Sequence, residues 1–163
     1  MQKFQKFQGL LVALLLATTP IQVLAHGDVT PHPIDTSTLK PLGDEWIEPN
    51  PYRGDATAIA VGALGYMHNC AGCHGLNAVS GGIAPDLLLL GKECLDLASK
   101  VKQAACMKES DHFFKEVTLR GKKNGEGRSI MPAYDAVFKQ EAVWAVKAYI
   151  DSRSLEEKAK NPN

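Results

Sequence analysis

The sequence lacks an excess of charge of either sign, and it lacks a long apolar run after its first residues. Its 163 residues include 18 basic and 18 acidic side chains, without a dense basic patch. Proteins that bind nucleic acid usually present clustered positive charge, so this class of function is disfavoured. No apolar stretch beyond residue 25 approaches the roughly 20 residues that a transmembrane helix requires, and we expect no lasting membrane anchor.

The chain also lacks internal repeats and any useful run of alternating apolar and polar residues. Such alternation is the usual pattern of a half-buried strand, whereas a helix repeats its apolar positions every three or four residues. Apolar residues recur at helical spacing over 56–69 and 140–152. The sequence therefore predicts an all-α fold with few helices and long loops.

The first 25 residues have the composition of a secretory signal peptide. A basic start precedes a short apolar run over 9–17, and the segment closes on the small-residue pattern Val23-Leu24-Ala25. We expect cleavage after Ala25 and export to the periplasm, with an uncleaved N-terminal anchor as the alternative. Cleavage of 25 from 163 residues leaves 138, a suitable size for one domain. Two of the 18 basic side chains are lost with the peptide, which leaves 16 against 18 acidic ones.

Proline and glycine divide the rest of the chain. Residues 26–54 contain five prolines and three glycines, which favours an extended arm that wraps the domain surface; a disordered arm is the alternative. We expect the main domain over 55–152 and a polar C-terminal tail over 153–163, frayed from Leu155. Asp55 is a plausible N-cap of the first helix. Between the two long helices we predict mostly loop over 75–93 and short helices over 94–102 and 111–119, the second capped near Asp111.

The most informative motif is Cys70-Ala71-Gly72-Cys73-His74. C-x-x-C-H is the attachment signature of a c-type haem, because each thiol can add to one vinyl group while the histidine becomes an axial iron ligand. The alternative, a thioredoxin-like oxidoreductase, requires a strand before the motif, and here the preceding pattern is helical. The sequence predicts one covalent haem c on Cys70 and Cys73, with His74 as the proximal ligand.

Met131 is the best-placed candidate for the second axial ligand. It follows a glycine-rich loop, precedes a proline, and lies far enough beyond the motif for the chain to return on the opposite haem face. Met67 and His68 are too close to the attachment site, whereas Met107 and His112 remain alternatives. Thioether ligation closes the iron and suits electron transfer. An open iron would suit a haem enzyme or a ligand-binding sensor.

Two further residues are candidates for contacts around this group. A backbone carbonyl near Pro85 could accept a hydrogen bond from the second ring nitrogen of His74, although Pro85-Asp86 is also a plain turn signal. Arg120 could approach a haem propionate, and a solvated surface arginine is the equally weighted alternative.

Cys94 and Cys106 remain after the motif is assigned, with eleven residues between them. An even number of remaining cysteines in an exported protein predicts a disulfide. Two buried free thiols are the alternative. The bond would stabilise the fold by roughly 3 kcal/mol on a chain-entropy model.

In this order the motifs resemble those of a class I monohaem cytochrome c. The matching elements are Gly62, Tyr66, Cys70-Ala-Gly-Cys73-His74-Gly75, Pro85-Asp86-Leu87, Arg120-Gly121, Met131-Pro132 and the helix Trp144…Tyr149. The resemblance implies the class I cytochrome c fold over 55–152. It also implies that the first and last helices cross at Gly62 and Tyr149, and that the carbonyl of Pro85 accepts from the proximal histidine.

A narrower resemblance is to PedF-type cytochromes. It depends on the arm from Val29 to Trp46, the loop from Ser80 to Asp86 and the Cys94/Cys106 pair. It implies a soluble periplasmic protein, not an enzyme, that accepts electrons from a quinoprotein (PQQ) alcohol dehydrogenase. We expect a monomer that passes these electrons to a downstream cytochrome or a terminal oxidase of the respiratory chain.

Overall fold

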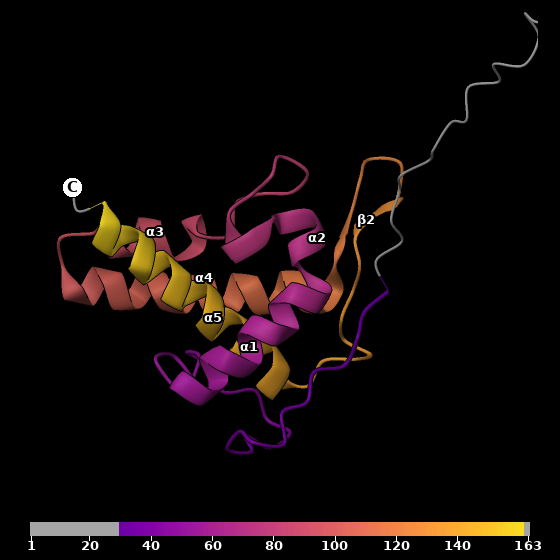
Figure 1. Cartoon of the computed structure of the whole chain (residues 1–163), viewed down its shortest axis with the longest axis horizontal. Helices are drawn as coiled ribbons and strands as arrows, with labels where there is room; N and C mark the ends of the chain where they lie inside the picture. The colour runs from indigo at the N-terminus through magenta and orange to yellow at the C-terminus, as the bar shows by residue number, and fades with distance from the viewer. Residues whose placement is uncertain (1–29, 162–163) are drawn as a thin grey trace, which may run out of the picture.

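The computed structural model describes residues 30–161 (Figure 1). The expected signal peptide and residues 26–29 of the arm lie outside the described residues. The elements, in chain order, are α1 (Ala56–Asn69), α2 (Ala71–His74), the 3-10 helix η1 (Leu76–Ala78), α3 (Leu89–Leu95), α4 (Lys100–Arg120), β1 (Lys122–Lys123), β2 (Ser129–Met131) and α5 (Gln140–Lys160). The predicted all-α class is confirmed, with one short antiparallel ribbon of β1 and β2.

Helix α1 begins and ends where the sequence predicts. The Asp55 carboxylate accepts a hydrogen bond from the backbone N–H of Ala58 at 2.8 Å. This N-cap satisfies one of the free N–H groups in the first turn. Helix α1 therefore begins at a defined place, and it ends directly before Cys70, whose N–H still donates to the carbonyl of Tyr66.

Helices α1 and α5 cross in backbone contact. A methyl group on Gly62 would lie 1.9 Å from the carbonyl oxygen of Ala145, so only glycine allows this approach. One turn further along α5, Tyr149 packs on Tyr66 with ring centroids 5.2 Å apart. The crossing implied at Gly62 and Tyr149 thus consists of two contacts, each made with a different residue of the opposite helix.

The predicted helices over 94–102 and 111–119 are wrong. Helix α3 ends at Leu95, and α4 runs without a break from Lys100 to Arg120. Asp111, expected near a cap, lies in the middle of α4 and is fully buried. The loop expected over 75–93 also contains η1 and the start of α3. The disulfide between Cys94 and Cys106 joins α3 to α4, with Cα atoms 5.4 Å apart.

The expected fraying from Leu155 is also wrong, because α5 continues to Lys160. Tertiary contacts hold its last turns. The Ser154 hydroxyl donates to the carbonyl of Leu88 at 2.9 Å, and the Lys158 ammonium pairs with Asp96 at 2.9 Å. Lys158 and Lys160 also lie near the C-terminus of the helix, where positive charge is favourable.

The described part of the arm is ordered and packs on the helices, running below α1 in Figure 1. Leu39 and Tyr52 are buried in the core. The backbone N–H of Leu42 donates to Glu141 at 2.8 Å, and the Trp46 ring meets Trp144 edge-on at 5.8 Å. Within residues 30–161, no helix has the length and apolar character needed to cross a membrane.

Candidate functional site

The C-x-x-C-H motif occupies one helical turn directly after α1. The N–H of Cys70 donates to the carbonyl of Tyr66, and the N–H of His74 donates to the carbonyl of Cys70 at 2.9 Å. Cys73 and His74 within α2 are therefore presented together with Cys70, its N-cap residue. The turn ends at Gly75, where φ is +79° and a methyl group would lie 1.9 Å from the carbonyl oxygen of Val79.

Both thiols of the motif are free and half-buried. Burial raises the pKa of the Cys70 thiol to about 12, with a further contribution from Cys73. Cys70 is therefore a neutral thiol at physiological pH. Tyr66 supports this turn from beneath, because its buried hydroxyl donates to the carbonyl of Gly75 at 2.7 Å.

The imidazole of His74 is oriented by the loop that follows it. Its Nδ1 lies 2.8 Å from the carbonyl oxygen of Pro85. A carbonyl oxygen can only accept, so Nδ1 carries the proton and Nε2 keeps its lone pair. This is the arrangement in which a histidine binds a metal through Nε2 while a backbone acceptor fixes the ring.

The backbone of Met131, on β2, packs against the tight turn that ends α4. Gly121 ends α4 with φ +66°, and a methyl group there would lie 2.5 Å from the carbonyl oxygen of Met131. Lys122 of β1 pairs with Met131 of β2. The Met131 side chain is partly buried against the core.

A hydrogen bond joins the Met131 segment to the cysteine motif across 65 residues of sequence. The hydroxyl of Tyr134 donates to the carbonyl of Asn69 at 2.7 Å, and Asn69 directly precedes Cys70. The structure thus brings together the two parts of the sequence that carry the candidate ligands, His74 and Met131.

The alternative axial ligands Met107 and His112 both lie on α4. Met107 is buried, and the exposed His112 lies 3.3 Å from Glu48 of the arm. Met67 and His68, which the sequence places too close to the attachment site, are exposed on α1.

Arg120 has a partner on its own helix. Its guanidinium pairs with Glu116 at 2.9 Å, and its side chain is 80% exposed. This is the geometry of a surface arginine, and the propionate contact stays a prediction.

The segment after the motif contains three exposed apolar side chains. Leu76, Val79 and Ile83 are 65%, 46% and 78% exposed. Exposed apolar side chains gathered in one segment usually mark a binding surface. Two free thiols, an imidazole with a free Nε2, a nearby thioether segment and this apolar surface fit a covalently attached haem. No cluster of three or more His, Cys, Asp or Glu among residues 30–161 offers a separate metal site.

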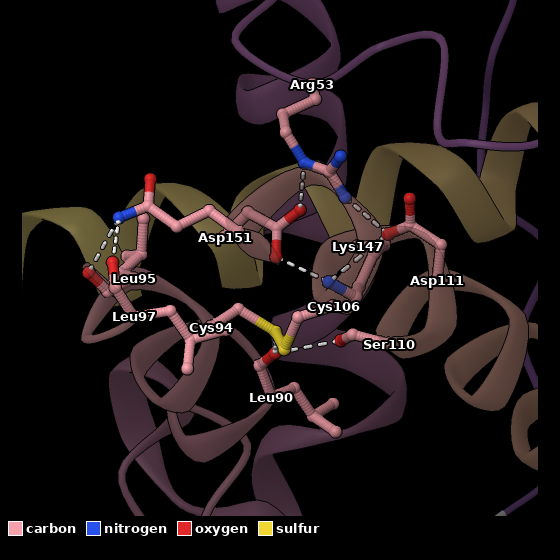
Figure 2. Close-up of a disulfide and its surroundings, with 11 residues drawn as sticks. Arg53, Leu90, Cys94, Leu95, Leu97, Cys106, Ser110, Asp111, Lys147 and Asp151 are labelled. Atoms are coloured by element: carbon pink, nitrogen blue, oxygen red, sulfur yellow. Dashed lines mark hydrogen bonds and ion pairs between the residues drawn. A yellow bond between two sulfur atoms is a disulfide. The ribbon is translucent and has the colours of Figure 1, made fainter. Parts of the chain in front are cut away.

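Sequence reasoning missed a cluster of four charged side chains, in which Asp111, Lys147 and Asp151 are buried and Arg53 is partly exposed. The Lys147 ammonium lies 2.5 Å from Asp151 and 3.4 Å from Asp111, and the Arg53 guanidinium reaches the same two carboxylates at 2.9 and 2.5 Å. Figure 2 shows both cations between the two carboxylates, with the Cys94–Cys106 disulfide nearby. The cluster joins the arm to α4 and α5, so it has a structural role.

The chain is similar to one protein family and to two known Pseudomonas proteins. A family described as cytochrome C oxidase, cbb3-type, subunit III matches residues 57–150. Cytochrome c550 of Pseudomonas aeruginosa is 40% identical over 161 residues, which cover 96% of this chain and 100% of that protein. Quinohemoprotein alcohol dehydrogenase ADH IIB of Pseudomonas putida is 28% identical over 109 residues, 67% of this chain but 13% of that enzyme. No solved structure matches.

Proposed function

Because this chain belongs to the cytochrome c family and is an electron-transfer protein with a class I cytochrome c fold and covalent haem c, we propose that Cys70 and Cys73 carry the haem and that His74 and Met131 are its axial ligands. We further propose that the protein is a periplasmic one-electron carrier. Its donor is a quinoprotein alcohol dehydrogenase, and its acceptor is a downstream cytochrome or a terminal oxidase.

The hydrogen bond between His74 and Pro85 is the observation that carries the ligand assignment. It fixes the imidazole ring and directs the lone pair of Nε2 away from the bond at Nδ1. The Met131 segment is locked separately against Gly121 and Asn69. Bound haem c supplies a one-electron ferric–ferrous couple, and His/Met ligation favours electron transfer over ligand binding. His74 and Met131, each held by its own contacts, would offer the iron the same two donors in both oxidation states.

The proposed donor is supported by the second relative. Part of a quinohemoprotein alcohol dehydrogenase is similar to 67% of this chain. A related haem domain is thus joined to alcohol oxidation within one polypeptide there. We infer that the same pairing occurs here between two separate proteins, with two successive reductions of this carrier for each alcohol oxidised.

Export is supported by two features of the chain. The first 25 residues have the pattern of a cleaved signal peptide. The Cys94–Cys106 disulfide suits an oxidising compartment. We propose a monomer in the periplasm, with 55–152 as the segment that holds the haem.

The test is to mix the oxidised, mature protein with purified quinoprotein alcohol dehydrogenases and their alcohols, and to follow the visible haem bands. Rapid reduction that requires both the enzyme and the alcohol supports the proposed donor. If only a chemical reductant changes the bands, the donor is wrong. Carbon monoxide binding by the reduced protein at neutral pH would instead contradict a closed His74–Met131 coordination.

A further inference from the structure

Tyr134 lies where the two ligand-bearing parts of the chain meet. It follows Met131 by three residues, is 3% exposed, and packs its ring on Phe138 with centroids 4.7 Å apart. Its hydroxyl donates to the carbonyl of Asn69 at 2.7 Å. Burial raises the pKa of Tyr134, so the hydroxyl stays protonated as a donor.

The acceptor of this bond is itself held in place. Asn69 is the last residue of α1, and its carbonyl is among the four at a helix end that lack an intrahelical donor. Its side-chain amide donates to the carbonyl of Gly65 at 3.0 Å and accepts the N–H of His32 at 2.8 Å. A donor that binds Asn69 is therefore fixed relative to Cys70, the next residue.

The backbone of Tyr134 is also fixed, from the side of α4. Its N–H donates to the carbonyl of Thr118 at 3.1 Å. The segment from Met131 to Tyr134 is thus attached to the end of α4 by the backbone and to the end of α1 by the phenol. Of these two attachments, only the second reaches the end of α1, directly before the cysteine motif.

We propose that Tyr134 is a positioning residue for Met131: its hydroxyl fastens the methionine segment to Asn69 and thereby holds the thioether at the iron. The inference rests on the proposed ligand role of Met131. When Met131 leaves the iron and its segment moves away, the bond between Tyr134 and Asn69 must break as well. The hydroxyl therefore stabilises the closed form against the open one.

Tyr134→Phe removes this bond and keeps the ring that packs on Phe138. In the closed form the buried carbonyl of Asn69 then lacks the phenol donor, while in the open form water hydrates it. A buried hydrogen bond of this kind contributes about 1 kcal/mol, which corresponds to about a fivefold shift between open and closed forms.

The experiment uses the mature ferric protein with its haem and titrates it with imidazole, which competes with the methionine thioether. Tyr134→Phe is expected to raise the apparent imidazole affinity about fivefold and to lose the near-infrared thioether–ferric band at correspondingly lower imidazole. Tyr52→Phe is the matched control, since it removes another buried phenol bond, to the carbonyl of Lys40, far from Met131 in sequence. It is expected to lower the free energy of unfolding but to leave the imidazole affinity unchanged.

Two results would overturn the proposal. The first leaves the proposed ligand role of Met131 intact, and the second overturns that role as well. If Tyr134→Phe and Tyr52→Phe both destabilise the fold and neither changes imidazole affinity, the role of Tyr134 is only structural, and the ligand assignment stands. If Met131→Ala leaves the thioether band of the otherwise unchanged protein intact, Met131 is not the ligand. The proposed coordination then fails together with the inference.

Discussion

Lys147→Met would remove a fully buried positive charge with little change in side-chain volume. Lys147 and Asp111 are both 0% exposed and Asp151 is 2% exposed. In the native protein two cations and two carboxylates share this site, so their formal charges cancel. The substitution leaves Arg53 alone with two buried carboxylates, and the cluster becomes net negative.

The magnitude follows from the burial of the remaining partners. Removing one member of a buried ion pair costs about 3–5 kcal/mol, because it leaves a charge without compensation. A single domain has a total free energy of unfolding of about 5–15 kcal/mol. At about 3–5 °C per kcal/mol for a domain of this size, we expect Tm to fall by about 9–25 °C.

The assay is chemical and thermal unfolding of the mature haem protein, followed by circular dichroism. Lys92→Met is the matched control, because Lys92 makes an exposed pair with Asp96 at 3.7 Å and should cost less than about 1 kcal/mol. The double variant Lys147→Met/Asp151→Asn restores charge balance, so it should be more stable than the two single losses added together. A loss below about 1 kcal/mol for Lys147→Met would refute this reasoning.

Three other predictions address the ligand, the disulfide and an arm contact. Met131→Ala should abolish the thioether–ferric band, lower the midpoint potential and allow the reduced protein to bind carbon monoxide. Replacing Cys94 and Cys106 together by serine should lower the free energy of unfolding by roughly 3 kcal/mol, because the unfolded chain loses its closed loop of 12-residue separation. Burial raises the pKa of Glu48, but hydrogen bonds and charge from Lys115 and His112 outweigh this and hold it below the ordinary 4.5. The stabilisation that ionised Glu48 contributes is therefore fully present above pH 4.5 and is lost as pH falls through its lower, folded-state pKa. The difference in unfolding free energy between wild type and Glu48→Gln should shrink on acidification; a constant difference would contradict the assignment.

The features predicted well from the sequence depend on local signals. The N-cap Asp55 accepts from Ala58, only three residues further along the chain, and helix α1 ends directly before the cysteine motif. The turn of the motif likewise needs only Cys70 to Gly75. Such elements are specified by side chains that contact their own backbone, so a linear pattern contains the information.

Helix α4 shows why other elements were misjudged. Its buried positions are Met107, Asp111, Phe114 and Thr118, which have helical spacing. The predicted helices left out 103–110, where Met107 is the single buried residue of α4, so apolar periodicity gives no signal there. The last turns of α5 were missed because tertiary contacts hold them. Ser154 contacts Leu88 and Lys158 contacts Asp96, and each pair is more than sixty residues apart in the sequence.

The buried charges are the hardest feature to infer, because Lys147 and Asp151 at i, i+4 have the pattern of an ordinary surface pair. The position of Lys147 in the helical pattern is the signal for its burial, because it lies on α5 between Val143 and Ile150, both 0% exposed. A buried lysine on that face needs carboxylates nearby to compensate its charge, and α5 supplies only Asp151. The second carboxylate, Asp111, comes from α4. Arg53 of the arm then makes the net charge of the cluster zero. A boundary drawn at residue 54 would therefore separate Arg53 from the carboxylates that it neutralises, which makes the arm a structural part of the haem-binding domain.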